Sequence, residues 1–380
     1  MTTRAARRKQ DRRVVDTVAR DRARDALLAG VVSVTEFREL ALDALDEDTF
    51  DYIDGGAWDE LTLADNDAAW LRRRLRPRVL VDVATTLTAS TMLGQPVSMP
   101  IAVAPMAVHG LAHPDGEVAS ARAAAAAGIP FVLSTMSSRS IEDVAAAAPA
   151  GLRWFQLYHQ ADEGRSRALV ERAAAAGYGA IVLTVDLPVL GYRERDRRSG
   201  FELSVPLGNF ADTGPTHVDR ADGLGTVVGT LSRTMTWHDL ATIRSWSSLP
   251  LVLKGVLTAE DARLAADHGI AAVVVSNHGA RQLDRTPATA DVLEEVVEAV
   301  AGRLEVWVDG GIRRGLDVVI ALALGARGVL VGRPILYALA TGGQPAVTRA
   351  LAILQEELEI ALALVGAPTP ADVRRSHVAD

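Results

Sequence analysis

The chain has 380 residues, of which 49% are hydrophobic and 23% charged, and its formal net charge is −8. This apolar fraction excludes an intrinsically disordered protein, and the length allows two domains or one large α/β barrel. The apolar runs, such as residues 318–324, are too short to cross a bilayer, and the acidic balance argues against nucleic acid as the main partner. There is no cysteine, which excludes disulfides, thiol nucleophiles and iron–sulfur ligands.

Residues 1–30 form a basic extension. Between Arg4 and Arg24 there are nine Lys and Arg residues against three Asp residues. A nucleic-acid-binding arm and a solvated helix both fit this pattern, and we expect the helix. The segment lacks the apolar core of a secretory signal, so we expect a cytoplasmic protein without membrane contact. Residues 31–380 are predicted to form a single domain.

From Pro100 onward, short β-branched runs alternate with amphipathic or Ala-rich helical stretches. Eight runs are predicted strands: 101–104, 131–134, 154–158, 180–186, 251–255, 272–277, 305–310 and 328–332. The predicted helices between them include 116–127, 140–148, 165–176, 258–268, 289–301 and 314–324. Apolar strands alternating with helices indicate a parallel sheet, and eight such units predict an α/β fold of the (β/α)8 TIM-barrel type, with strands at about 100–334.

Two segments do not follow this alternation of strands and helices. Residues 1–99 are predicted as helices and a short hairpin that close one mouth of the barrel. The connection after the fourth strand is far longer than the others, and we predict a mobile loop at about 195–235. Loops of this length are usually functional lids or disordered segments, and this one lies at the C-terminal mouth of the barrel.

The residues that end the strands of such a barrel converge on one site. Here they form a polar, ionisable set on an apolar scaffold: Pro105, Met106, Ala107, Ser134, Thr135, Gln156, Tyr158, Thr184, Asp186, Lys254, Ser276, Asn277, His278, Asp309, Gly310, Gly311, Gly332 and Arg333. This pattern predicts an active site, and it contains no spacing typical of a metal site.

Two turns after the last two strands indicate a phosphate-binding site. Gly310 and Gly311 let backbone N–H groups approach phosphate oxygens, and Arg313 follows them with a positive charge. Gly332 and Arg333 repeat this arrangement after the eighth strand, at the usual phosphate position of these barrels.

Lys254 ends the fifth strand and has three interpretations. It could form a Schiff base in an aldolase, stabilise an anionic cofactor ring, or make a structural ion pair. The segment around His278 is more informative, because His278 is a base that works near neutral pH and Arg281 offers a planar fork for a carboxylate. The pair suits proton abstraction next to a carboxylate.

These residues resemble the FMN-dependent α-hydroxy-acid oxidases and dehydrogenases, which include glycolate, lactate and mandelate oxidases. The resemblance runs from about Asp51 to the C-terminus. The motifs that carry it are SNHGARQLD (276–284), VDGGIRRG (308–315), GRP (332–334), LKGV (253–256), WFQLY (154–158), LTVD (183–186) and HPDGE (113–117).

The resemblance implies FMN as cofactor and oxidation of an (S)-2-hydroxy acid to the 2-oxo acid. It implies that His278 is the base, that Asp186 stabilises its imidazolium, and that Lys254 supports the reduced flavin. The substrate residues would be Tyr52, Tyr158, Arg193, His278, Arg281, Met136 and Ala107. The flavin and phosphate residues would be Pro105, Met106, Ala107, Ser134, Gln156, Thr184, Lys254, Ser276, Asp309, Gly310, Gly311, Arg313, Gly332 and Arg333. A homo-oligomer, tetrameric or octameric, is also implied.

The chain departs from glycolate oxidase at two positions. Met136 replaces a tryptophan beside the substrate, and Met106 replaces a threonine, so we expect a mandelate-like or longer aliphatic acid to be preferred over glycolate. Residues 195–235 are polar and lack a membrane-seeking helix, which favours an oxidase that uses O2 and forms H2O2.

Other functions fit the residues less well. A dehydrogenase of the same family with another electron acceptor stays open. An aldolase using Lys254 would leave His278 and Arg281 unexplained, and a non-catalytic flavin-binding barrel or an FMN-dependent isomerase would not need the substrate residues. Barrels of the inosinate-dehydrogenase type need a cysteine nucleophile, which this chain lacks.

Overall fold

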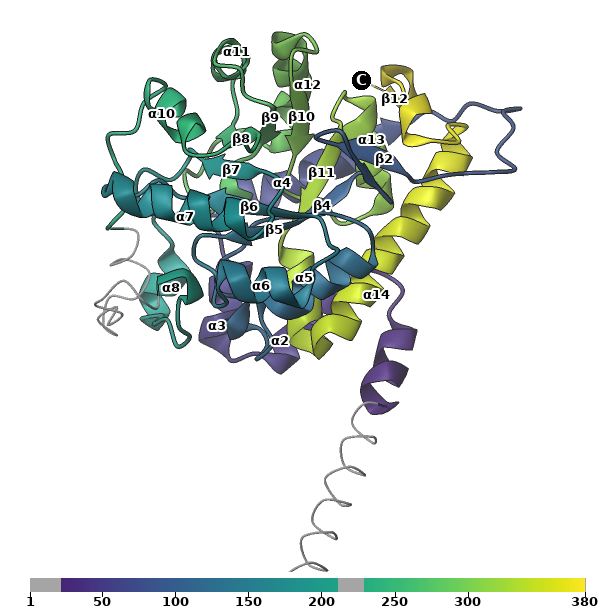
Figure 1. Ribbon diagram of the computed structural model, residues 1–380. Helices are drawn as coiled ribbons and strands as arrows, with labels where there is room; N and C mark the ends of the chain where they lie inside the picture. Colours follow the sequence, from purple (N-terminus) through teal and green to yellow (C-terminus); the bar gives the residue numbers. More distant parts are fainter. Residues whose placement is uncertain (1–21, 211–228, 380) are drawn as a thin grey trace, which may run out of the picture.

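The computed structural model describes residues 22–210 and 229–379, which form a closed parallel barrel surrounded by helices (Figure 1). The strands follow one another around the barrel in the order β10-β11-β4-β5-β6-β7-β8-β9. Their bounds are β4 Ile101–Val103, β5 Phe131–Ser134, β6 Arg153–Leu157, β7 Ile181–Thr184, β8 Leu251–Val256, β9 Ala272–Val275, β10 Glu305–Val308 and β11 Gly328–Val331. The predicted (β/α)8 barrel and its eight strands are confirmed.

Six helices of the outer layer agree with the predicted ranges, and two were not predicted. The six are α5 Glu117–Ala126, α6 Ile141–Ala147, α7 Glu163–Ala175, α11 Ala259–Asp267, α12 Thr289–Val300 and α13 Gly315–Ala323, and the other two are α10 Asp239–Ser245 and α14 Arg333–Val365. Ser140, Asp162 and Thr258 precede α6, α7 and α11, and each side chain accepts a hydrogen bond from a backbone N–H of the first turn. These caps satisfy donors that the helix itself leaves unpaired.

Side chains alternate between the inside of the barrel and the helices, because successive strand residues point to opposite faces. The inside is filled by apolar residues, among which Trp154 and Trp307 stack with ring centroids 4.9 Å apart. A hairpin of β2 Ser90–Met92 and β3 Gln95–Val97 closes the N-terminal end, where Met92 and Val97 join this interior cluster.

The remaining N-terminal helices lie elsewhere than the sequence suggested. Residues 22–30 are helical, and α2 Glu36–Ala44, α3 Glu47–Asp54 and α4 Leu61–Arg72 follow them. Trp70 of α4 donates a hydrogen bond to the carbonyl of Gly310, beyond the C-terminal end of β10. Residues 22–99 therefore reach both ends of the barrel, whereas we expected them to close one.

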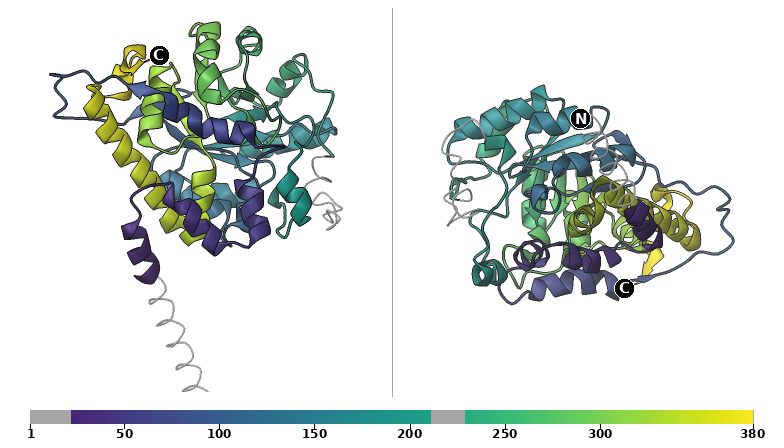
Figure 2. Two further views of the ribbon diagram at one scale, coloured as in Figure 1. Left: turned by 180° about the vertical axis from the view of Figure 1, so that it is seen from behind. Right: turned by 90° about the horizontal axis from the view of Figure 1, so that it is seen from below.

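Helix α14 is longer than a barrel helix, and the sequence analysis did not predict it. The chain leaves helical geometry at Gly342 and Gly343 and then continues outward beside α5. The segment between α4 and β2 extends away from the barrel next to the end of α14 (Figure 2), where Arg78 donates its backbone N–H to the carbonyl of Val365. Two short strands, β1 Arg74–Leu75 and β12 Val378–Ala379, pair there.

The connection after β7 begins with a folded segment rather than an irregular loop. Helix α8 Glu194–Ser199 is followed by a short 3-10 turn, Gly208–Phe210, in which Asn209 is buried and donates to the carbonyls of Ser134 and Thr135. The predicted loop also includes residues 211–228, and the basic extension includes residues 1–21; both lie outside the described residues. None of the helices in the described ranges is long and apolar enough to span a bilayer.

Candidate active site

A pocket opens at the C-terminal ends of the barrel strands, where the sequence predicted a site. Seventeen predicted residues line it: Tyr52, Pro105, Met106, Ala107, Ser134, Met136, Tyr158, Arg193, Lys254, His278, Arg281, Asp309, Gly310, Gly311, Arg313, Gly332 and Arg333. The other six predicted residues do not line it. Thr135, Gln156, Thr184, Asp186 and Ser276 hydrogen-bond to one another or to lining residues. Asn277, between Ser276 and His278, hydrogen-bonds to Asn66. The structure therefore brings the whole predicted set together.

His278 is held between a carboxylate and a phenol. Its Nδ1 lies 2.9 Å from Oδ1 of Asp186, and its Nε2 lies 3.2 Å from the hydroxyl of Tyr158. Burial lowers the pKa of His278 below its ordinary value, although Asp186 opposes this effect. The imidazole is therefore neutral at neutral pH, with Nδ1–H donating to Asp186 and Nε2 free to accept a proton.

The Asp186 carboxylate stays charged in spite of its burial. Desolvation acts to raise its pKa, but the neighbouring His278 and Lys254 lower the pKa below the ordinary value. Its second oxygen, Oδ2, is buried and has no hydrogen-bond partner among the described residues. A buried carboxylate of this kind stabilises a positive charge that forms on His278.

Lys254 is a fixed positive charge at the bottom of the pocket. Its Nζ lies 2.9 Å from Oδ2 of Asp309 and donates to the hydroxyl of Ser276 at 2.8 Å. Burial disfavours the ammonium, but Asp309 and Asp186 raise the pKa of Lys254 above its ordinary value. A Schiff-base lysine needs a lowered pKa, so the aldolase alternative does not fit this geometry.

The guanidinium groups in the pocket donate mainly to backbone carbonyls. Arg281 Nη1 lies 2.6 Å from the carbonyl oxygen of Tyr52 and 2.9 Å from that of Gly55, and Arg333 also donates to Gly55. Arg193 donates to the carbonyl of Arg281 at 3.3 Å, and burial lowers the pKa of Arg193 to about 10. The group remains protonated at neutral pH, so these positive charges are available to an anionic ligand.

Two phenols complete the polar side of the pocket. The ring of Tyr52 stacks on Phe201, with centroids 4.4 Å apart, and the guanidinium carbon of Arg281 lies 4.9 Å from the Tyr52 ring centre. Burial raises the pKa of Tyr158, which keeps its hydroxyl protonated and able to donate.

The other end of the pocket suits a phosphate. Gly310 and Gly311 have φ angles of 88° and 80°, and a Cβ on Gly311 would lie 2.2 Å from the carbonyl oxygen of Asn66. Only glycine fits there. Arg333 opens helix α14 directly after Gly332, and Arg313 pairs loosely with Asp67 at 3.2 Å. Backbone N–H groups of a glycine turn, a helix N-terminus and arginines are the elements of an anion site.

One wall of the pocket is apolar and was not predicted. Leu187, Leu190 and Leu231 line it next to Tyr158. Leu187 and Leu190 follow the LTVD motif and could have been suspected from their distance to Asp186. Leu231 is held in place by an antiparallel bridge to Gln160. No local sequence signal predicts this bridge.

Comparisons with known proteins decide the family. The sequence model of FMN-dependent dehydrogenases matches residues 41–380. The chain is 48% identical to an L-lactate oxidase from Nostoc sp. over 92% of this chain and 99% of that protein. It is 46% identical to the glycolate oxidase of Spinacia oleracea over 92% and 96%. The chain belongs to the FMN-dependent dehydrogenase family.

Solved structures of mandelate oxidase agree with this family assignment. A crystal structure of mandelate oxidase is 42% identical, covers 92% of this chain and 98% of that one, and superimposes with a TM-score of 0.85. A second, with (S)-4-hydroxymandelic acid, has a TM-score of 0.87 at 42% identity. The protein is thus a member of the FMN-dependent 2-hydroxy-acid oxidase and dehydrogenase family, as the resemblance implied.

The side chains of the pocket fit FMN independently of these comparisons. A buried strip of hydrogen-bonding side chains, Ser134, Gln156 and Thr184, leads from the apolar Pro105 side toward Lys254. Oδ1 of Asp309, at the start of the phosphate turn, is buried without a partner in the described structure. A flat polar ring, a polyhydroxyl chain and a phosphate match these features in turn.

Proposed function

We propose that the protein oxidises (S)-2-hydroxy acids with an apolar side chain to 2-oxo acids, and that O2 is reduced to H2O2. The observation that carries this proposal is the position of the apolar wall of Leu187, Leu190 and Leu231. It lies beside Tyr158 in a pocket that Met136, His278 and Arg281 also line. A carboxylate on the arginines would leave an apolar substituent facing leucines rather than water.

The polar residues of the pocket account for binding. Arg193 and Arg281 would hold the substrate carboxylate. Arg193 is buried and Arg281 half-buried, both donate to backbone carbonyls, and the only carboxylate near either in the described structure is Asp196, 3.9 Å from Arg193. The hydroxyl groups of Tyr52 and Tyr158 would hold the carboxylate and the substrate hydroxyl. Planar guanidinium groups suit this task because they offer paired donors.

His278 would be the base. The reaction removes two electrons and two protons from the hydroxyl-bearing carbon and its oxygen, and Nε2 of His278 takes the hydroxyl or α proton. Asp186 would stabilise the resulting imidazolium through its contact with Nδ1. When bound, FMN supplies the acceptor for the electron pair.

The cofactor would lie along the strand ends. Lys254 and Ser276 would support the anionic side of the ring. The residues proposed for the rest of the flavin are Pro105, Met106, Ala107, Ser134, Gln156 and Thr184, and those for the ribityl phosphate are Asp309, Gly310, Gly311, Arg313, Gly332 and Arg333.

The preferred substrate would be larger than glycolate. The relatives are named for lactate, glycolate and mandelate, so family membership alone does not choose between these acids. Met136 and Met106 are flexible thioethers that adapt to varied apolar shapes. Contacts with an apolar pocket are worth about 1–3 kcal/mol each, so mandelate should exceed glycolate in kcat/KM by about tenfold or more.

A substrate panel tests this proposal. The purified enzyme is given glycolate, lactate, 2-hydroxyoctanoate and both enantiomers of mandelate under air, and H2O2 and 2-oxo acid are both measured. Equal amounts of the two products support an oxidase. A 2-oxo acid formed only with an added electron acceptor would support the dehydrogenase alternative instead.

The homo-oligomer, tetrameric or octameric, and the cytoplasmic location stay predictions.

A further inference from the structure

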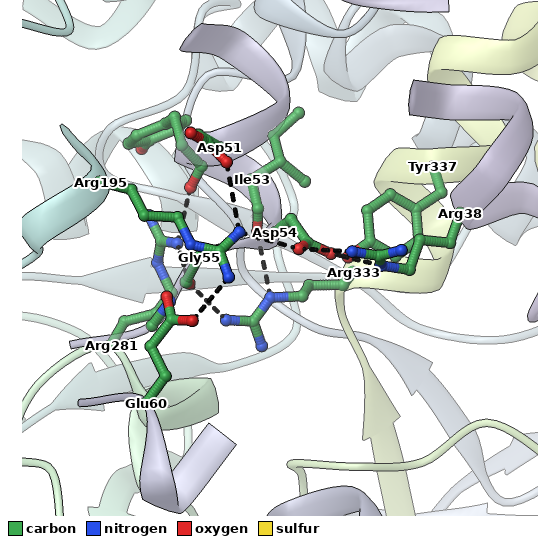
Figure 3. Close-up of polar contacts among 12 residues, drawn as sticks. Arg38, Asp51, Ile53, Asp54, Gly55, Glu60, Arg195, Arg281, Arg333 and Tyr337 are labelled. Atoms are coloured by element: carbon green, nitrogen blue, oxygen red, sulfur yellow. Dashed lines mark hydrogen bonds and ion pairs between the residues drawn. The ribbon is translucent and has the colours of Figure 1, made fainter. Parts of the chain in front are cut away.

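Arg195 has no role in the proposed function, yet it lies among three carboxylates (Figure 3). Its Nη1 is 3.2 Å from Oδ1 of Asp51 and 3.2 Å from Oδ2 of Asp54, and its Nη2 is 2.6 Å from Oε2 of Glu60. Arg195 belongs to α8, whereas the two aspartates belong to α3 and Glu60 directly precedes α4. One side chain therefore ties the segment after β7 to the N-terminal helices.

Both sides of this contact carry residues of the pocket. Arg193, two residues before Arg195, is the residue from which α8 starts, and Tyr52 lies on α3 between the two aspartates. Phe201, just after α8, stacks on the ring of Tyr52 at an interplanar angle of 4°. A shift of α8 against α3 would therefore move Arg193 and Tyr52 relative to each other.

The ion pairs of Arg195 also neutralise part of the negative charge of this carboxylate cluster. Burial acts to raise the pKa of Asp54, but hydrogen bonds from Arg38 and Tyr337 lower it to about 2, so Asp54 is ionised. Arg38 and Arg195 thus neutralise the carboxylates of this cluster. Arg281 and Arg333 have no carboxylate within 4.0 Å in the described part of the chain and donate to Gly55 instead.

We propose that Arg195 is a positioning residue that clasps α8 to α3 and thereby holds Arg193 and Tyr52 in the geometry that binds the substrate carboxylate. This inference rests on the proposed function of Arg193 and Tyr52. Without Arg195, the carboxylates of Asp51, Asp54 and Glu60 repel one another and attract the arginines of the pocket. Binding of the substrate carboxylate then weakens. His278 keeps its contacts with Asp186 and Tyr158, so proton transfer at His278 is little affected.

Arg195→Gln tests the clasp, with Arg195→Lys as the conservative variant and Arg198→Gln as the matched control. Arg198 lies on the same helix but its side chain is 74% exposed, and among the described residues its one ion pair is with Glu194 of that helix. The probe is benzoylformate, the 2-oxo acid related to mandelate, and its Kd is read from the absorbance change of the bound flavin. Turnover of mandelate is measured in parallel.

We expect Arg195→Gln to raise the Kd of benzoylformate and the KM of mandelate by about tenfold or more, since small misplacements of binding groups are costly. The kcat should change less than about threefold, because His278 and Asp186 are untouched. Arg195→Lys should recover part of the loss, and Arg198→Gln should match the wild type. Hydrogen exchange of residues 194–201 in the holoenzyme should be faster in Arg195→Gln only.

Glu60→Gln keeps the acceptor for the backbone N–H of Gly56 while it removes one charge of the cluster. It should raise the Kd of benzoylformate about threefold, as expected for loss of a partly exposed ion pair. If Arg195→Gln does not fold, this variant alone tests whether Arg195 acts as a positioning residue. Wild-type affinity in Glu60→Gln and in any folded Arg195→Gln protein would overturn the clasp. A wild-type enzyme that binds benzoylformate but turns over no 2-hydroxy acid would refute the proposed function and leave the affinity test of the clasp valid.

Discussion

Nδ1 of His278 lies 2.9 Å from Oδ1 of Asp186, and this contact determines which imidazole nitrogen faces the pocket. The two residues follow β9 and β7, which are separated only by β8. Because Asp186 accepts a hydrogen bond from Nδ1–H, Nε2 is left as the base beside Tyr158. The acid–base chemistry of the site therefore depends on a neutral His278 next to an ionised Asp186.

The pH dependence follows from this pair. Burial lowers the pKa of His278, so the base is lost only when the pH falls through a value below the ordinary 6.5. We expect kcat/KM to rise with pH along an acid limb below pH 6.5 and then to level off. A limb centred above 6.5 would contradict the assignment.

Asp186→Asn should remove the interaction that opposes the effect of burial. The pKa of His278 then falls further and the acid limb moves to lower pH. The rate at the plateau should also fall, by about 10²-fold to 10⁴-fold, because the imidazolium is no longer stabilised. A pH–rate profile of the variant measures both effects, and an unchanged plateau would show that Asp186 does not act on the base.

His278→Gln should keep the flavin but lose its reduction by substrate. A positioned acid–base group contributes about 10²-fold to 10⁴-fold to the rate. Stopped-flow absorbance without oxygen measures this step, and the flavin content of the variant serves as the control. If reduction slows less than about tenfold, His278 is not the base.

Arg281→Lys should weaken substrate binding, because an ammonium cannot replace a planar fork that also donates to Tyr52 and Gly55. The comparison of mandelate with its amide isolates the carboxylate. The wild type should favour the acid strongly, and the variant much less. A variant that discriminates between the two as well as the wild type does would place the carboxylate elsewhere.

Much of this architecture could be predicted because its signals are local. Apolar runs marked the strands, and the side chains that follow them, such as Lys254 and His278, had to meet at one end of a parallel barrel. Helix α14 was missed because Gly342, Gly343 and Pro345 interrupt its pattern. Leu231 and the partners of Arg195 were missed because only the folded chain brings them near, across sequence separations that no periodicity reports.

Met136→Trp should reduce the space in the pocket. Met136 is buried and lines the pocket, so an indole there would fill volume that a phenyl group could use. The preference for mandelate over glycolate should narrow to less than about threefold or reverse, as expected when an apolar contact is lost. The ratio of the two kcat/KM values measures this change. An unaltered ratio would show that substrates do not reach this space.

The most direct test of the account is the absorbance of the purified wild-type protein during anaerobic mixing with (S)-mandelate or glycolate. The protein should be yellow, release FMN on denaturation, and lose its visible flavin absorbance with (S)-mandelate at low concentrations at which glycolate acts slowly. Admission of air should restore the absorbance and yield H2O2. A protein that takes up no FMN, or whose bound FMN is not reduced by any 2-hydroxy acid, would contradict the account.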